Sequence, residues 1–360
     1  MSQQRNVGVD ALKIASMFMV LTLHVLGQGG VLETTPSGSL RWAGAWLLEV
    51  ICYGAVNQFA LASGYVGVLS HHRPSNILSL WMQVFLYSVA ISVIGYVISP
   101  SLFGIGQLLH AVLPISFGVY WYMTAYVLTM LIAPAIDSAL HRYGDLPNRC
   151  IIVLFLFFFS FIPTFTGIEP NHLGLGYSFV WIAFLYYLGG YIRIYKGKNE
   201  RPVIFSILIA IACYLFTWIF TCLKHLQPLS FSEMSFLSYL SPTILLPSLL
   251  HLEEASKFKV GERAATFCAW AVPATLDIYL IHVHPVPWTA FVKNRFVALS
   301  LLPSYVLPLA VLSSAIVAFF ILLLVGRLRT SLFRAMDIRG RLRAVDELWA
   351  STIAGSSNPS

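Results

Sequence analysis

Long apolar runs recur along the whole chain, and they constrain its fold more than any other feature of the sequence. A membrane-spanning helix needs roughly 20 mostly apolar residues, because its backbone polar groups must all be hydrogen-bonded inside the hydrocarbon. The chain is 58% hydrophobic and only 10% charged, and a soluble fold of this size would leave too much apolar surface in water. Windows of that length predict about ten spans: 8–27, 45–69, 77–99, 118–140, 150–165, 177–195, 203–223, 234–250, 264–283 and 303–326.

Two of these segments fit a straight span of this length less well than the others. Segment 150–165 is short and ends at Pro163, and segment 234–250 carries Pro242 and Pro247, so it is either a kinked span or partly re-entrant. Proline is tolerated inside a membrane helix where neighbouring groups satisfy the freed carbonyl. We therefore keep both segments in an all-α, polytopic transmembrane helix bundle.

The basic residues predict the orientation of this bundle. If the N-terminus is cytoplasmic, 17 of the 22 Lys and Arg residues fall in inside segments, and Lys13 lies within the first span. Only four fall outside: Arg41, Lys224, Lys293 and Arg295. Cytoplasmic loops carry such an excess of positive charge. The bias predicts an even number of spans with both termini cytoplasmic.

We divide the chain into a transmembrane domain, residues 1–326, and a basic cytoplasmic tail, residues 327–360. Leu328 and Leu332 lie between arginines of the tail, which predicts an amphipathic segment on the membrane lipids of the inner leaflet. The last residues, from Gly355 onward, are expected to be disordered. The net charge of +7 is explained by these loops and the tail, and nothing in the sequence predicts nucleic-acid binding.

The five cysteines include no CxxC pair and lie in or beside apolar runs. Cysteine pairs at short spacing are the signal for zinc sites, and an extracellular framework of cysteines is the signal for disulfides. The sequence therefore favours buried free thiols and predicts neither a disulfide framework nor a metal.

The first span carries two ionisable residues, Lys13 and His24, at a depth where such groups are costly and mark functional sites. Their separation of 11 residues is close to three full turns, so both lie on one helix face, roughly 16 Å apart along the axis. Imidazole titrates near neutral pH, which suits proton transfer. The alternatives are that His24 only bonds a carbonyl of a neighbouring helix and that Lys13 reaches the inner headgroups.

A second polar cluster lies near the end of segment 264–283. Asp277 precedes His282 by about a turn and a half, and a carboxylate beside an imidazole can fix its tautomer. The alternative is that His282 lies at the outer headgroups and caps its helix.

Segments 45–69 and 118–140 add weaker candidates for substrate binding. Glu49 is expected near the outer end of its span, whereas Asn57 lies near the middle, where hydrogen bonding between helices is the commoner role. Trp121 and Tyr122 form either part of an aromatic belt at the outer interface or a stacking platform for a sugar or acyl group.

The order of these strings resembles that of the membrane-bound acyltransferase 3 family. The family signature is a basic residue, ten intervening residues and a histidine, which Lys13 and His24 match. Stretch 59–65 is similar to the family's second-helix motif. Trp121 with Tyr122, and stretch 278–282, resemble its later landmarks. The resemblance extends to about residue 326, which is essentially the whole transmembrane domain.

This resemblance implies an enzyme that moves an acyl group, often acetyl, from acetyl-CoA or another acyl-CoA in the cytoplasm to a hydroxyl of a cell-surface or lipid-linked glycan. It implies that His24 is the general base or a transient acyl carrier. Lys13 is expected to hold the first helix through Asp10 or to contact the donor. The family's distribution favours the bacterial inner, or plasma, membrane.

The resemblance is less informative about the donor. Arg73 is a candidate for contacts with the donor phosphates, but the second family motif, arginine-x-x-arginine, is absent near 71–73. Asp277 and His282 are candidates for orienting the acceptor.

Two other functions compete with acyl transfer. A transporter or flippase of a glycan or small molecule would use paired intramembrane charges or broken helices in matching halves, and we find no internal repeat. A non-enzymatic sensor or membrane-assembly protein would use His24 only structurally. Without the resemblance, the ionisable residues favour the enzyme and the transporter about equally.

Overall fold

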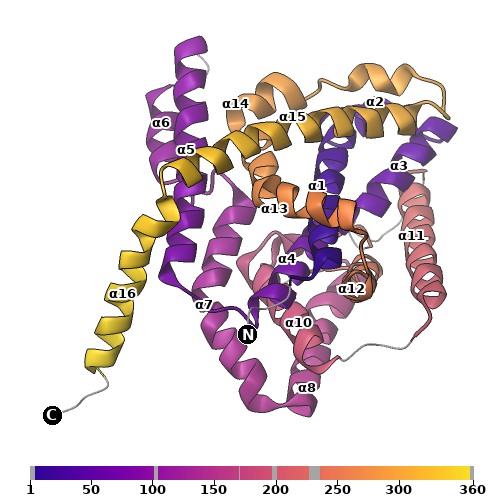
Figure 1. The fold of residues 1–360 in the computed structure, drawn as a ribbon. Helices are drawn as coiled ribbons and strands as arrows, with labels where there is room; N and C mark the ends of the chain where they lie inside the picture. Colours follow the sequence, from indigo (N-terminus) through magenta and orange to yellow (C-terminus); the bar gives the residue numbers. More distant parts are fainter. Residues whose placement is uncertain (1–4, 101–103, 170, 197–200, 227–235, 357–360) are drawn as a thin grey trace.

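The computed structural model describes residues 5–100, 104–169, 171–196, 201–226 and 236–356. Within these residues every regular element is a helix (Figure 1). Eight helical segments of the described chain are long and apolar enough to cross a membrane: Val7–Thr34, Leu40–Gly67, Pro74–Ile98, Trp121–Tyr143, Asp145–Thr166, Val203–Leu226, Glu262–His282 and Leu307–Ala335. The prediction of an all-α, polytopic bundle is confirmed, whereas the cytoplasmic placement of the termini stays a prediction.

Most spans begin and end within a few residues of their predicted limits. The first segment is α1 (Val7–Leu26), followed by the short α2 (Val31–Thr34). The second is a pair, α3 (Leu40–Tyr53) and α4 (Ala55–Gly67), which meet at Gly54. The next are α5 (Pro74–Ile98), α6 (Ile105–Val112), α7 (Trp121–Tyr143), α11 (Val203–Leu226), α13 (Glu262–His282) and α15 (Leu307–Ala335).

The segment predicted as 150–165 is longer in the structure than in the sequence analysis. It comprises α8 (Asp145–Leu156), a π-helical turn η1 (Phe157–Phe161) and α9 (Ile162–Thr166). The π turn ends two residues before Pro163, which has no N–H to donate to the preceding turn. The local widening lets the helix continue past the proline, so Pro163 does not end the helix.

The two remaining predicted spans are shorter helices. Segment 177–195 forms α10 (Phe179–Tyr195), and segment 234–250 contains the start of α12 (Pro242–Lys257). Residues 234 and 235 lie outside the described residues. Pro242 occupies the first turn of α12, where its missing N–H costs no hydrogen bond. Short irregular helices complete the described chain: η2 (Gly174–Gly176), α14 (Pro285–Pro287), η3 (Trp288–Val292) and η4 (Val297–Leu301).

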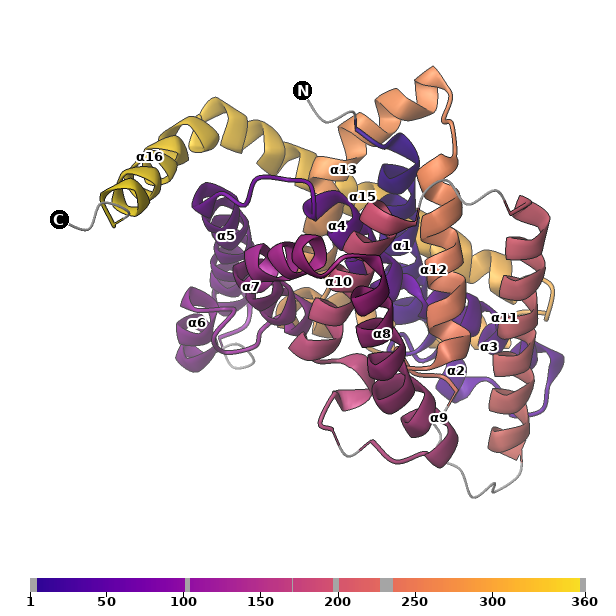
Figure 2. The ribbon, with the colours of Figure 1, turned by 90° about the horizontal axis from the view of Figure 1, so that it is seen from below.

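Helix α1 occupies the centre of the bundle. It packs against α3, α4, α12, α13 and α15, and Figure 2 shows it among α4, α12, α13 and α15. Asn6 caps its first turn by accepting a hydrogen bond from the Val9 N–H (3.1 Å). Gln58 of α4 bonds both α1 and α12. Its amide oxygen accepts from the hydroxyl of Ser16 in α1 (3.1 Å), and its amide nitrogen donates to Nδ1 of His251 in α12 (2.9 Å).

Helices α4 and α10 approach each other through glycine. A Cβ atom on Gly64 would lie 2.6 Å from the carbonyl carbon of Tyr186, and a Cβ on Gly189 would lie 2.9 Å from that of Leu61. Small residues at such a crossing let two membrane helices pack backbone against backbone. This contact fixes the position of α4 against α10.

The C-terminal region consists of two consecutive helices. Helix α15 runs through the predicted boundary at residue 326 and ends at Ala335, and α16 (Ile338–Ser356) follows it away from the bundle (Figure 1). Gly355 and Ser356, predicted to be disordered, belong to α16, and residues 357–360 lie outside the described residues. Asp346 of α16 accepts hydrogen bonds from the Ser75 N–H (3.0 Å) and hydroxyl (2.7 Å) of α5. The two-part domain division and the lipid contact stay predictions.

Candidate active site

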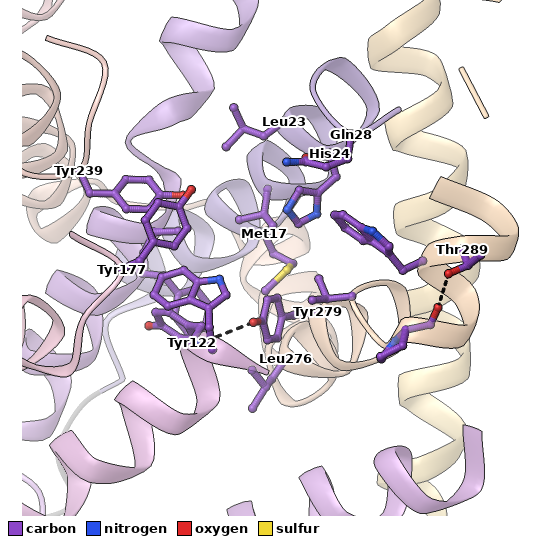
Figure 3. A pocket seen from close by; sticks show the side chains of 17 residues that line it. Met17, Leu23, His24, Gln28, Tyr122, Tyr177, Tyr239, Leu276, Tyr279 and Thr289 are labelled. Carbon is purple, nitrogen blue, oxygen red and sulfur yellow. Dashed lines mark hydrogen bonds between the residues drawn. The ribbon is translucent and has the colours of Figure 1, made fainter. Parts of the chain in front are cut away.

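A cavity of about 430 Å³ lies beside α1, between α4, α7 and the end of α13. Its lining is mostly aromatic and aliphatic, and it includes a few polar side chains (Figure 3). Pockets of this size and mixed lining are typical of small-molecule sites. Its chemistry is therefore set by the small number of polar groups that face it.

The face of α1 that lines the cavity is the face predicted from the sequence. Met17, Val20 and His24 all border the cavity, and Lys13 lies one turn before Met17 on the same helical stripe. Lys13 itself is half-buried and does not line the cavity. Among the described residues it makes no hydrogen bond or ion pair. The stripe leads from a lysine that interacts electrostatically with Asp10 to an imidazole in the cavity.

His24 forms a direct contact with His282. The Nδ1 atom of His24 lies 2.8 Å from Nε2 of His282, and Nδ1 of His282 lies 2.5 Å from the Ile278 carbonyl oxygen. The Trp288 ring lies edge-on to His24, with 5.1 Å between the ring centroids. The structure thus joins two sequence candidates that we assigned to different roles, and it places them in the last turns of α1 and α13.

Asp10 lies far from this pair. It forms an ion pair with Arg5 at the beginning of α1, and the guanidinium of Arg5 also donates to the Cys268 carbonyl oxygen (3.3 Å). A helix rises 1.5 Å per residue, so Asp10 is about 21 Å from His24 along the axis. Asp10 therefore ties α1 to α13 through Arg5 and lies far from the imidazole, while its carboxylate interacts electrostatically with Lys13 one turn along α1.

Asp277 does not orient a histidine, contrary to one role that the sequence suggested. Its fully buried carboxylate pairs with Arg329 (2.7 Å) and accepts a hydrogen bond from Gln83 (2.5 Å). Five residues correspond to a rotation of about 140° around a helix, which separates Asp277 from His282 on the helix surface. The carboxylate joins α5, α13 and α15 instead.

The weaker candidates of α3 and α4 lie outside the cavity lining. Asn57 is fully buried, donates to the Tyr239 carbonyl oxygen (2.9 Å) and accepts from the indole of Trp181 (3.1 Å), so it links helices. Glu49 is buried, and its Oε2 has no hydrogen-bond partner in the part of the chain that the structure describes. It lies one turn before Tyr53, whose ring is 5.1 Å from that of Tyr239, a cavity residue.

Trp121 and Tyr122 line the cavity, which favours the platform over a purely interfacial role. The Trp121 ring lies 4.7 Å from Tyr177 and 6.4 Å, nearly parallel, from Tyr239. The Tyr122 hydroxyl is buried without a hydrogen-bond partner among the described residues. An aromatic wall with an uncommitted hydroxyl can stack on a ring and donate one hydrogen bond to it.

Arg73 is exposed and lies at the start of α5, away from the cavity. Its neighbour His72 contacts the Asp137 carboxylate (2.5 Å). The role of Arg73 in donor binding stays a prediction.

Several cavity residues were not among the sequence candidates. Tyr279, Trp288, Tyr177 and Tyr239 all line it. Tyr279 belonged to a stretch noted for its resemblance, and its hydroxyl oxygen accepts from the Tyr122 N–H (3.4 Å). Tyr177 follows η2 and Tyr239 precedes α12, so both lie in connecting segments, although the sequence analysis placed both inside predicted spans. In the described residues no three His, Cys, Asp or Glu side chains gather in a way that could hold a metal ion.

Comparison with known proteins gives one match. The family model described as an acyltransferase domain matches residues 6–327, nearly the whole chain. Neither the curated proteins nor the solved structures gave a match. The matched region includes every residue that lines the cavity.

Proposed function

Since this chain belongs to the acyltransferase 3 family, and is thus a multi-pass membrane acyltransferase, we propose that it transfers an acyl group from a cytoplasmic acyl-CoA to a hydroxyl of a cell-surface or lipid-linked glycan. Acetyl is the expected acyl group and the bacterial plasma membrane the expected location. The observation that carries the proposal is the imidazole of His24, which faces a cavity of about 430 Å³ and is held there by His282.

His24 acts as the general base in this proposal. Its free ring nitrogen takes the proton of the acceptor hydroxyl as the hydroxyl oxygen attacks the thioester carbonyl carbon. The carbon–sulfur bond then breaks, and the departing thiolate takes the proton from the His24 imidazolium. The products are the acyl ester and free CoA, so the proton returns to the thiol and none is lost.

The two substrates approach from opposite ends of the α1 stripe. The donor comes from the side of Lys13, whose ammonium interacts electrostatically with Asp10 but forms no hydrogen bond among the described residues, so it can still bond a donor phosphate or thioester oxygen. The thioester must then pass Met17 to reach His24, since Met17 lies between them on the stripe. A cation on this path lowers the cost of bringing an anionic donor into the membrane.

The acceptor enters the aromatic half of the cavity. Trp121, Tyr177 and Tyr239 line this half, and sugars stack on aromatic rings through their C–H surfaces. The Tyr122 hydroxyl, which lacks a partner within the described chain, donates to a sugar oxygen. In this arrangement the acceptor supplies the hydrogen-bond partner that the Tyr122 hydroxyl lacks among the described residues.

The test is mass spectrometry of cell-surface glycans from cells that express the wild-type chain, His24→Ala or His141→Gln. His141 is an exposed histidine of α7 outside the cavity, so its variant is the matched control. We expect one added acyl mass on a defined sugar with the wild type and the control, and none with His24→Ala at equal protein level. Unmodified glycans in all three cultures, with transport of a glycan instead, would favour the flippase.

A further inference from the structure

The hydrogen bonds of His282 determine which nitrogen of His24 carries a proton. The Ile278 carbonyl oxygen can only accept a hydrogen bond, so Nδ1 of His282, 2.5 Å away, must carry the hydrogen. In a neutral ring the other nitrogen, Nε2, is then an acceptor. It faces Nδ1 of His24 at 2.8 Å, so His24 must donate from Nδ1.

The same two hydrogen bonds leave the second nitrogen of His24 unprotonated. A neutral imidazole with hydrogen on Nδ1 has its lone pair on Nε2. Within the described residues no hydrogen bond to this Nε2 is present, and His24 lines the cavity (Figure 3). We therefore propose that His282 is a positioning residue, which holds His24 in the tautomer that presents an unprotonated Nε2 to the substrate.

The position of the pair at two helix ends supports this role. His24 lies in the last turn of α1 and His282 in the last turn of α13. The carbonyl end of a helix carries partial negative charge, which stabilises a nearby imidazolium. When His24 gains a proton at Nε2, its Nδ1–H still donates to His282, and the new charge lies on a side chain of the last turn of α1.

No carboxylate contacts either ring among the described residues, because Asp10 pairs with Arg5, and Asp277 with Arg329. The second histidine and the Ile278 carbonyl therefore take the place that a carboxylate holds in the serine-protease triad, where it fixes the tautomer of the base. This inference rests on the proposed role of His24 as base.

The kinetic test compares two substitutions of His282. His282→Leu removes the acceptor and is expected to lower kcat about 10²- to 10⁴-fold, the range for losing a positioned base, with KM changed less than threefold. His282→Gln keeps an oxygen that accepts the Nδ1–H of His24, so we expect it to recover at least tenfold over the leucine variant. Unfolding midpoints are measured for both, and His284→Gln, a buried neighbour that bonds Ser92 and the Val286 N–H, is the control.

A spectroscopic test does not depend on activity. In ¹⁵N-histidine-labelled wild type, with the His24 signals assigned by their loss in His24→Gln, we expect a protonated Nδ1 and an unprotonated Nε2. A protonated Nε2 in the wild type, or equal kcat in His282→Leu and the wild type, would overturn the inference. If no variant or wild type transfers acyl groups but the nitrogen signals are as expected, the proposed function fails and the tautomer assignment stands.

Discussion

The glycine contact between α4 and α10 makes a quantitative prediction for Gly189→Ala. The new Cβ would lie 2.9 Å from the Leu61 carbonyl carbon and from the Tyr65 nitrogen, and closer still to the Leu61 oxygen. Carbon atoms in contact are about 3.5 Å apart or more, so the helices must separate by at least about 0.6 Å. Overpacking of this kind costs about 1–3 kcal/mol.

The control for this variant is Gly44→Ala in α3. Its Cβ would meet nothing closer than a Pro308 side-chain atom at 4.0 Å. Both substitutions gain the same 0.5–1 kcal/mol or so from replacing glycine by alanine inside a helix. The difference between the two variants therefore isolates the packing cost.

Unfolding by SDS titration in mixed micelles measures that difference. We expect Gly189→Ala to unfold at lower SDS, by about 1–3 kcal/mol relative to Gly44→Ala. Acyl transfer should fall as well, because α4 carries Val56 and Phe59 into the cavity lining. Equal stability of the two variants would refute the backbone-to-backbone packing.

The remaining predictions concern the C-terminal helices. Arg329→Met leaves the buried Asp277 without its counter-charge and should cost about 3–5 kcal/mol, whereas the double variant Asp277→Leu with Arg329→Met should recover most of it. The same SDS titration measures both, and strictly additive costs would show that the pair is not coupled. Hydrogen bonds from the Ser75 hydroxyl and N–H hold the pKa of Asp346 below its usual value. The stability that this contact contributes is therefore fully present above the pKa of the unfolded chain, roughly 3.9. It is lost as the pH falls through the lower pKa that Asp346 has in the folded protein. Distances between spin labels on α5 and α16 should lengthen only in that acidic range, and no change there would count against the contact.

The span pattern could be predicted from sequence because lipid imposes it locally. A chain in hydrocarbon must satisfy its backbone within each helix, so apolar length alone located segments such as Glu262–His282, predicted as 264–283. The exception at Pro163 arose because a π-helical turn is a backbone adjustment that side-chain hydropathy does not encode.

The site was only half predictable for a related reason. Periodicity places Lys13 and His24 on one face and gives their depths, but it does not say which helix lies opposite. The contact between His24 and His282, and the pairing of Asp277 with Arg329, are properties of helix neighbours. Each histidine lies near the end of its predicted segment, but only the packing of α1 on α13 brought the two rings together.

The central claim is that the cavity imidazole of His24 carries the proton in acyl transfer. The most direct measurement is the rate of thiol release from acetyl-CoA by purified protein in lipid nanodiscs, with acceptor glycan present. We expect His24→Ala to lower this rate at least about 10²-fold, while His141→Gln keeps the wild-type rate. A His24→Ala protein that is folded and releases thiol at the wild-type rate would contradict the claim.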